Sequence, residues 1–341
     1  MFQDIISRYK RRNAATLMDC PYPKPVAIVG LGTHCITNIV PVLEQLRVPI
    51  SHILVRSPHI ASVVARRFPD ANLVDSIPPV LDDPSVKTVF VATPATTHLA
   101  LVSQLLQSSK NVFIEKPPCE TLAELHQLIL LRKNAIVQVG LQKRFAPAVR
   151  VLQRQLGRHR ADHYLLRYGT GAYPEGDALT DLFIHPLDLA VHLFGPAEVV
   201  SIVRSPDNTI LLHLDHNGTK GALELSTSYS WQQPVEELTV VTKDGVYSLE
   251  STDCLSFSPR PHSFIGIPLE KIHPRHPTNV TLYHRDTFSP VFSANRLVSS
   301  GFYYEIEAFL SALQHNSPKG LTTLESLIPV YKIMESISRG K

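Results

Sequence analysis

A charged pair directly after an apolar segment is the most chemically informative feature of the sequence. Glu115 and Lys116 follow the apolar residues at 111–114 and precede two prolines, which stop a strand and fix the local backbone. In an open parallel sheet, the carboxyl ends of the strands border the crevice where ligands bind. Lys116 is therefore a candidate for stabilising negative charge on a reacting oxygen, although a solvated strand end would explain this tripeptide if it stood alone.

A second group of ionisable residues has helical spacing. Asp181 and His185 are four residues apart, which places them on one helical face, although Pro186 favours a helix that begins only there and ends near Gly195. A carboxylate beside a histidine raises the imidazole pKa and orients the ring, which suits a general acid or base near neutral pH. The alternative is a capping histidine with a structural aspartate. Asp188 is expected to brace the helix rather than to react.

A glycine-rich turn follows the first apolar strand and opens a helix. Gly30 allows the tight turn, and Gly32 lets the backbone approach a pyrophosphate. That group would then sit on the helix N-terminus, at Thr33 and His34. Cys35 replaces the third glycine of the dinucleotide-binding pattern, so the match is incomplete and a plain strand-to-helix turn remains an alternative.

The residues after the second strand bear on the choice of cofactor. An NAD-preferring fold carries an acidic residue about 20 residues after the glycine turn, where it binds the ribose hydroxyls. This sequence has Arg56 and Ser57 there, which could bind a 2′-phosphate, and no carboxylate that would repel one. The pattern favours NADP over NAD, with the alternative that Arg56 only points to solvent.

A third motif follows the strand expected at 88–92. The backbone at Thr93 and Pro94 could line the nicotinamide side of the crevice, and His98 could meet the helix that follows. A histidine at a helix N-terminus with no contact to the cofactor is the alternative.

Alternating apolar strands and amphipathic helices position these motifs. Strands are expected at 26–29, 52–55, 88–92, 111–114 and 136–140, with helical patterns between them. Short crossovers of this kind predict a doubly wound parallel sheet covered on both faces. Thr121 and Glu124 predict a capping box at the start of the helix that follows Lys116.

After about residue 160 the pattern changes to strands with one buried face. They are expected at 164–168, 199–204, 210–215, 222–228, 238–242 and 246–249, which predicts a mainly antiparallel sheet. Residues 254–298 are rich in Pro, His and Ser and are expected to form a long loop. Two amphipathic helices complete the chain, one over 302–313 and one from the cap at 322 to about 338.

Length and composition predict a soluble protein of more than one domain. The 341 residues divide into an arm or appended helix at 1–24, a dinucleotide-binding domain at 25–143, and a substrate and oligomerisation domain at 144–341, whose last helices could pack back on the first domain. A hydrophobic content of 44% fits a globular core, and a net charge of +3 is too small to indicate nucleic acid or an anionic membrane. No apolar run is long enough for a transmembrane helix.

Three further features of the sequence bear on the compartment of the protein and on metal binding. They are the cysteines, the histidines and the first 24 residues. The four cysteines form no C-x-x-C pair, which indicates reduced thiols in a cytoplasmic protein. The first 24 residues are basic, so organelle targeting remains a weaker alternative to an arm. His273 and His276 have ligand-like spacing but no third ligand nearby, and we expect no metal site.

Taken in order, these motifs resemble the glucose–fructose oxidoreductase and inositol dehydrogenase family, often called Gfo/Idh/MocA. The resemblance runs from Val26 to Ser338. It rests on five segments of the sequence: Gly30-Leu31-Gly32, Ala92-Thr93-Pro94 with His98, Glu115-Lys116-Pro117, Val139-Gly140 through Arg144-Phe145-x-Pro147, and Asp181-x-x-x-His185-x-x-Asp188.

The resemblance implies a fold, a cofactor and a substrate class. The fold would be an N-terminal Rossmann domain followed by an α/β domain with a large open, mainly antiparallel sheet, through which the chain would form a homodimer or homotetramer. The cofactor would be NADP or NAD, and the substrate a sugar, cyclitol or related polyol. The sequence gives no indication of a nucleic-acid or membrane partner.

The resemblance also implies roles for individual residues. Lys116 would touch the reacting hydroxyl or carbonyl, His185 would give or take the proton, and Asp181 would orient the substrate or the histidine. Glu115 would support Lys116, and both would contribute to cofactor binding. Arg144 would contribute to substrate binding, and the Lys116-Pro117 bond would be cis. These roles describe an NAD(P)-dependent oxidoreductase. The alternatives are a cofactor-retaining glycosidase or lyase that oxidises a sugar transiently, and a non-catalytic regulator that senses a dinucleotide.

Overall fold

The computed structural model describes residues 2–16, 22–261, 263–265, 267–272, 279–285 and 295–340. The chain forms two compact units. Unit 1 comprises 1–140 and 303–325, and unit 2 comprises 141–302 and 326–341. His273 and His276 lie outside the described residues. None of the described helices combines the length and the hydropathy that a membrane-spanning helix needs.

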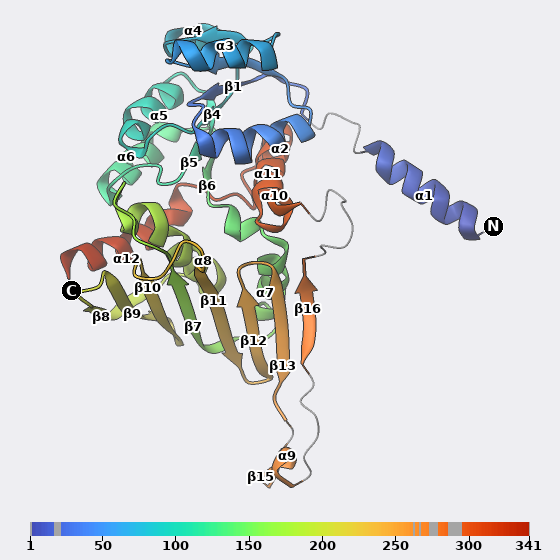
Figure 1. The fold of residues 1–341 in the computed structure, drawn as a ribbon, viewed down its shortest axis with the longest axis vertical. Helices are drawn as coiled ribbons and strands as arrows, with labels where there is room; N and C mark the ends of the chain where they lie inside the picture. Colours follow the sequence, from blue (N-terminus) through green and yellow to red (C-terminus); the bar gives the residue numbers. More distant parts are fainter. Residues whose placement is uncertain are drawn as a thin grey trace. The chain divides into compact units, whose positions relative to one another are not determined.

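Unit 1 is a parallel six-stranded sheet with helical crossovers (Figure 1). Its strands are β1 (Val26–Val29), β2 (Ile50–Leu54), β3 (Asn72–Val74), β4 (Thr88–Val91), β5 (Asn111–Glu115) and β6 (Val137–Gly140). The spatial order β3-β2-β1-β4-β5-β6 is that of a Rossmann fold, and the order reverses between β1 and β4. The predicted doubly wound sheet is confirmed.

Short helical segments connect these strands. They are η1 (Cys35–Ile39), α2 (Val40–Gln45), α3 (Pro58–Arg67), α4 (Pro78–Asp82), η2 (Ala95–Thr97), α5 (His98–Gln107) and α6 (Leu122–Arg132), with α1 (Phe2–Thr16) at the start of the chain. The predicted capping box begins α6, where Thr121 Oγ1 accepts from Glu124 N and the Glu124 carboxylate accepts from Thr121 N.

An aromatic cluster forms part of the core of unit 1. Phe90 of β4 stacks on Phe113 of β5 with ring centroids 5.1 Å apart. Phe309 of α11 (Phe302–His315) lies edge-on to both rings, with centroids 5.8 Å from each. All three rings are buried, and burial of large aromatic side chains dominates core energetics. Helix α11 therefore belongs to the core of the Rossmann unit, although a long stretch of unit 2 separates it from β6 in the chain.

Unit 2 is built on an eight-stranded sheet of order β16-β13-β12-β11-β7-β10-β9-β8 (Figure 1). The strands are β7 (Ala161–Gly169), β8 (Glu198–Arg204), β9 (Thr209–His216), β10 (Thr219–Ser226), β11 (Val235–Thr242), β12 (Gly245–Glu250), β13 (Cys254–Pro259) and β16 (Val280–His284). Only the β7–β10 pair is parallel, and the other pairs are antiparallel. The predicted open, mainly antiparallel sheet is confirmed.

The remaining elements of unit 2 are mostly helical. They are η3 (Gln142–Phe145), α7 (Pro147–Leu156), η4 (Leu179–Phe183), α8 (Ile184–Phe194), α9 (Leu269–Ile272), α10 (Arg296–Ser299), η6 (Glu325–Leu327), α12 (Ile328–Arg339) and the hairpin of β14 (Ser263–Phe264) with β15 (Ile267–Pro268). Helix α7 packs near β12, β13 and β16, and α8 packs near β7. Alternate residues of the strands are buried, as in the pattern of β9.

The expectation of one long loop at 254–298 is wrong for part of that range. Leu255 and Phe257 alternate with serines, and β13 pairs with β12 and β16. The prolines and histidines of the range obscured this short alternation, which is the period of a strand with one buried face.

The other face of the sheet exposes apolar side chains. Leu165 of β7 and Leu211 of β9 are 52% and 44% exposed, and Val200 and Val203 of β8 are also exposed. An Arg167 ion pair with Glu224 and another with Glu237 cross the same face. Contiguous exposed apolar surface commonly marks an interaction site. The expectation of a homodimer or homotetramer through this sheet comes from the family resemblance, is supported by these side chains, and stays a prediction.

We expect light scattering to give the mass of a dimer or tetramer. Leu165→Glu places a charge on the exposed face and should lower that mass without unfolding the sheet, because Leu165 packs no core. Leu130→Glu is the matched control, since Leu130 of α6 is 80% exposed and lies in unit 1. A monomeric wild-type protein would contradict the expectation.

Candidate active site

The glycine turn lies at the point where the strand order of unit 1 reverses. Gly30 has a φ of 93°, in the region that favours glycine. A Cβ there would come within 2.6 Å of the Ala92 carbonyl oxygen and 2.7 Å of Thr93 Cγ2. Gly30 is thus required by the close approach of the turn after β1 to the end of β4. A Cβ on Gly32 would meet no heavy atom within 4 Å.

Cys35 occupies the position of the missing third glycine. It is fully buried at the start of the π-helical segment η1, which continues into α2. The predicted helix is therefore interrupted by wider turns, a feature often found at functional sites. The buried thiol shows that the helix accepts a small side chain at this position.

Glu115 lies between the glycine turn and the last strand of the sheet. The Nε2 atom of His34 is 3.1 Å from Glu115 Oε1, and the other ring nitrogen of His34 is 3.1 Å from Asn38 Nδ2. Glu115 pairs with Gly140 across β5 and β6, and a Cβ at Gly140 would come within 2.9 Å of the carboxylate. The structure therefore brings His34 and Glu115 together, and Gly140 makes room for the carboxylate.

Lys116 follows β5 and is half-buried, and its peptide bond to Pro117 is cis, as expected. The end of β5 and the end of β4 are joined through His98. Its Nδ1 lies 2.7 Å from the Pro117 carbonyl oxygen, and its Nε2 lies 2.8 Å from the Thr93 carbonyl oxygen. His98 therefore links the backbone beside Lys116 to the loop at Thr93 and Pro94.

His98 itself is fully buried. Burial lowers the pKa of His98, while the two carbonyl oxygens oppose that shift. A neutral imidazole has one N–H, so it donates to only one of these carbonyls at a time. These contacts describe a residue that positions the two loops, and its predicted contact with a cofactor stays a prediction.

Arg56 and Ser57 follow β2 at the same edge of the sheet. The parallel register of β1 and β2 pairs Val29 with Leu54, so the two chain segments leave the sheet side by side. Arg56 is exposed and Ser57 is half-buried. This edge therefore presents a cation near the glycine turn.

Asp181 and His185 lie on one continuous helical segment of unit 2. Asp181 belongs to η4 and His185 to the first turn of α8, and both side chains are half-buried. Helix α8 begins at Ile184, earlier than the predicted start at Pro186, because a proline in the first turn removes an N–H that has no partner within the helix. It ends at Phe194 with Gly195 as its C-cap, close to the predicted end.

Tyr173 and Asp177 lie in the loop after β7. Tyr173 contacts the Asp181 side chain, and Asp177 caps the helical segment that carries it. The Tyr173 hydroxyl donates to Asp181 Oδ2 at 3.2 Å, and Asp177 accepts from Leu179 N and Thr180 N at the start of η4. Burial raises the pKa of Tyr173, and the nearby Asp181 carboxylate adds to the shift, so the phenol stays protonated and able to donate. The Asp-x-Leu-Thr spacing at 177–180 is a capping signal that the sequence analysis missed.

Arg144 and Asp188 form a buried ion pair. Arg144 Nε donates to Asp188 Oδ2 at 2.8 Å, Arg144 Nη2 contacts Asp188 Oδ1, and Arg144 Nη1 donates to Ser326 Oγ at 3.2 Å. The pair joins η3, α8 and the segment before α12. Arg144 was predicted to bind substrate. These contacts favour a bracing role, and substrate contact stays untested.

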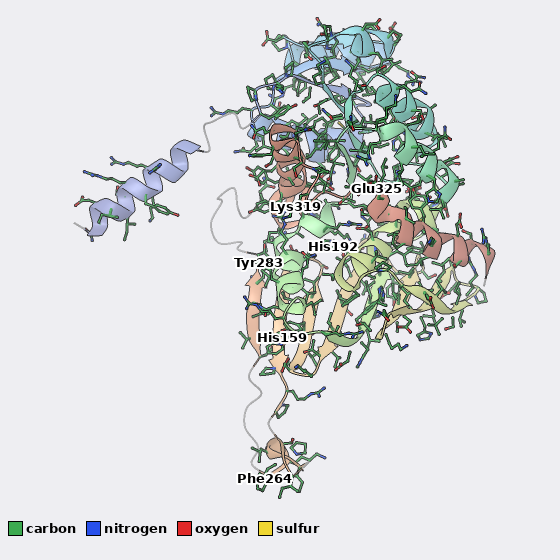
Figure 2. All side chains as sticks on the ribbon, turned by 180° about the vertical axis from the view of Figure 1, so that it is seen from behind. His159, His192, Phe264, Tyr283, Lys319 and Glu325 are labelled. Carbon is green, nitrogen blue, oxygen red and sulfur yellow. The ribbon has the colours of Figure 1, made fainter. Side chains whose placement is uncertain are left out.

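His192 lies one helical turn after Asp188 on α8 (Figure 2). Burial, together with the Arg144 cation, lowers the pKa of His192 to about 4. The imidazole is therefore neutral near pH 7 and adds no positive charge beside the buried guanidinium.

Two comparisons with known proteins agree with this architecture. Residues 24–142 match a family model, GFO_IDH_MocA, described as an oxidoreductase family with an NAD-binding Rossmann fold. A dehydrogenase from Chromobacterium violaceum is 21% identical with a TM-score of 0.79, covering 94% of this chain and 96% of that one. No curated protein matches the chain in sequence.

Two further solved structures have the same fold. A levoglucosan dehydrogenase in complex with NADH and levoglucosan is 17% identical with a TM-score of 0.78, covering 93% of this chain and 96% of that one. A 3-ketoreductase from Actinomadura kijaniata in complex with NADP and TDP-benzene is 16% identical with a TM-score of 0.73, covering 93% and 98%.

Residues 24–142 therefore match the Gfo/Idh/MocA oxidoreductase family, and the Rossmann domain that they form is of the NAD-binding class. The family predicted from the ordered motifs is the one whose model matches this domain.

We expect that breaking the Arg144–Asp188 pair destabilises unit 2. Removing one partner leaves an uncompensated buried charge, so Arg144→Met or Asp188→Leu should cost about 3–5 kcal/mol in urea unfolding. The double variant should cost clearly less than the sum of the two single changes.

Lys220→Met is the matched control, since Lys220 and Asp215 form an exposed pair, which contributes at most about 1 kcal/mol. Single variants of the buried pair that cost no more than this control would contradict the bracing role. A change in substrate KM without loss of stability in Arg144→Met would support substrate binding instead.

Proposed function

We propose that the protein transfers hydride between a nicotinamide cofactor and a secondary alcohol or ketone of a sugar, cyclitol or related polyol. The observation that carries the proposal is the position of Lys116, which follows β5 at the same edge of the sheet as the glycine turn. That edge is where doubly wound sheets bind ligands. The similar levoglucosan dehydrogenase supports a substrate with a sugar ring, and the similar 3-ketoreductase supports chemistry at a carbonyl group.

The residues of the glycine turn fit a dinucleotide. Gly32 leaves its surroundings open to an approaching phosphate, and the N–H groups of Thr33 and His34 lie at the start of a helical segment, where anions are stabilised. The loop at Thr93 and Pro94 would line the nicotinamide side. A bound nicotinamide supplies hydride transfer, and the protein supplies orientation and charge.

The side chains of the protein would transfer the hydroxyl proton and stabilise the charge on the reacting oxygen. His185 takes the hydroxyl proton when the alcohol is oxidised and returns it when the ketone is reduced. The Lys116 ammonium stabilises negative charge that develops on the reacting oxygen, with Glu115 beside it at the end of β5. Asp181, held by Tyr173, orients the substrate or the histidine.

Arg56 and Ser57 favour NADP over NAD. A guanidinium is suited to a phosphate, and neither of these two residues carries a carboxylate that would repel the 2′-phosphate. The protein is expected to act in the cytoplasm, where its thiols would stay reduced.

Two other functions on the same fold make different predictions. A glycosidase or lyase that oxidises its sugar transiently would turn over without added cofactor. A regulator that only senses a dinucleotide would keep its biological function in the Lys116→Ala variant. The presence of both Lys116 and His185 favours the dehydrogenase.

Replacing Lys116 by alanine should lower kcat by roughly 10²- to 10³-fold, because stabilisation of the developing oxyanion is lost. Binding of NADPH, measured by titration, should weaken far less than kcat falls. Lys87→Ala removes an exposed lysine of unit 1 and should leave kcat unchanged. Full activity in the Lys116→Ala variant on a polyol and sugar panel would refute the assigned role.

Replacing Arg56 by alanine should weaken NADPH binding roughly tenfold, which corresponds to about 1.4 kcal/mol, and leave NADH binding unchanged. The loss is selective because only NADPH carries the 2′-phosphate. Arg66→Ala, an exposed arginine in the last turn of α3, is the control. Tighter binding of NADH than of NADPH to the wild-type protein would contradict the cofactor preference.

A further inference from the structure

Trp231 lies near Tyr173, the residue that contacts Asp181, because β7 and β10 are parallel. Ser226 of β10 pairs with Gly169 of β7, so the two strands end at the same edge of the sheet. The chain after β7 leads through Tyr173 to Asp181, and the chain after β10 leads to Trp231. The two loops are joined where Thr170 N donates to Ser226 O and Tyr229 N donates to Thr170 O, each at 2.9 Å.

Backbone contacts hold the indole in one place. Trp231 Nε1 donates to the Ala172 carbonyl oxygen at 2.8 Å. Trp231 sits in a turn closed by the Ser230–Gln233 bridge, in which Ser230 Oγ also accepts from Gln232 N. The ring packs over Gly171, where a Cβ would collide with indole Cδ1. The indole can therefore occupy this position only because residue 171 is a glycine.

This fixed ring is nevertheless exposed. Trp231 is 53% exposed, and its ring centroid is 6.5 Å from that of Tyr173 at an interplanar angle of 56°. The Tyr173 hydroxyl in turn donates to Asp181. Tyr173 therefore connects the exposed indole face of Trp231 to the Asp181 carboxylate, which is proposed to orient the substrate or His185. Exposing a rigid aromatic surface is typical of a recognition site.

The chemistry of the group matches a ring-shaped polyol. Carboxylate and imidazole groups bind hydroxyls, while an indole face packs against the apolar C–H face that a sugar or cyclitol ring presents. We propose that Trp231 stacks on the ring of the substrate and selects cyclic polyols and sugars over open-chain polyols. This inference rests on the function proposed above and names the residue that recognises its substrate class.

The test uses the fact that Trp231 is the only tryptophan in the chain. Intrinsic tryptophan fluorescence therefore reports on this position alone. The full-length protein, with and without oxidised cofactor, is titrated with myo-inositol and levoglucosan as ring compounds and with sorbitol as an open-chain polyol. The ring compounds should shift the emission to shorter wavelength by excluding water from the indole, and sorbitol should not.

Kinetics of two variants separate stacking from a structural role. Trp231→Leu should raise KM for the ring substrate roughly tenfold with kcat nearly unchanged, because the contact binds ground state and transition state alike. Trp231→Phe keeps a flat ring but lacks the N–H, so it should recover most of the affinity. Equal damage in both variants would show that the Ala172 hydrogen bond matters and stacking does not.

Phe264→Leu is the matched control, since Phe264 is 66% exposed on the β14–β15 hairpin and should leave KM unchanged (Figure 2). An emission spectrum that no ring compound changes, or an unchanged KM in Trp231→Leu, would overturn the inference even if the protein is an active dehydrogenase. A protein that shows the shift but turns over no polyol with NADPH or NADH would refute the proposed function and leave the stacking in place.

Discussion

Two regions depend on the parallel pairing of strands: the glycine turn of unit 1, and the loops of unit 2 that carry Tyr173 and Trp231. Parallel neighbours leave a sheet at the same edge, so the residues that follow them become neighbours even when they are far apart in sequence. In unit 1 this pairing brings Gly30 against the end of β4. Among the described strands of unit 2, only β7 and β10 pair in parallel, and this pair joins the loop that carries Tyr173 to the loop that carries Trp231.

The contacts around these strand ends are mostly made by the backbone. His98 reaches two carbonyl oxygens, and Trp231 donates to a third. Glycines at positions 30, 140 and 171 provide the space that these approaches need. Fixing side chains by backbone partners and by close packing keeps their orientation, which a site that must align reacting groups requires.

Much of the fold follows from the spacing of apolar residues in the sequence and from the glycines and prolines that end strands and helices. The apolar runs before Gly30 and Glu115 identify buried parallel strands, and the alternation in β10 identifies a strand with one buried face. The motif residues after the strands, such as Lys116, can be found in the same way. Pairing between distant segments has no local signature, which is why the strands at 254–284 and the packing of Phe309 on the first sheet were not foreseen in detail.

The same limit applies to partners of ionisable residues. Arg144 was expected to bind substrate because the family resemblance implied that role. The distance to Asp188 is a property of the packing of η3 on α8, and no spacing in the sequence encodes it. Asp188 was expected to brace its helix, since a carboxylate interacts favourably with the start of a helix.

Cys35 has a consequence for the chemical robustness of the protein. Burial raises the pKa of this thiol to about 12, and the Glu115 carboxylate adds to the shift. Thiolate is the form that reacts with alkylating agents and oxidants, and almost none of it exists at neutral pH under these conditions. A cysteine in the dinucleotide turn therefore does not make the Rossmann unit sensitive to the redox state of its surroundings.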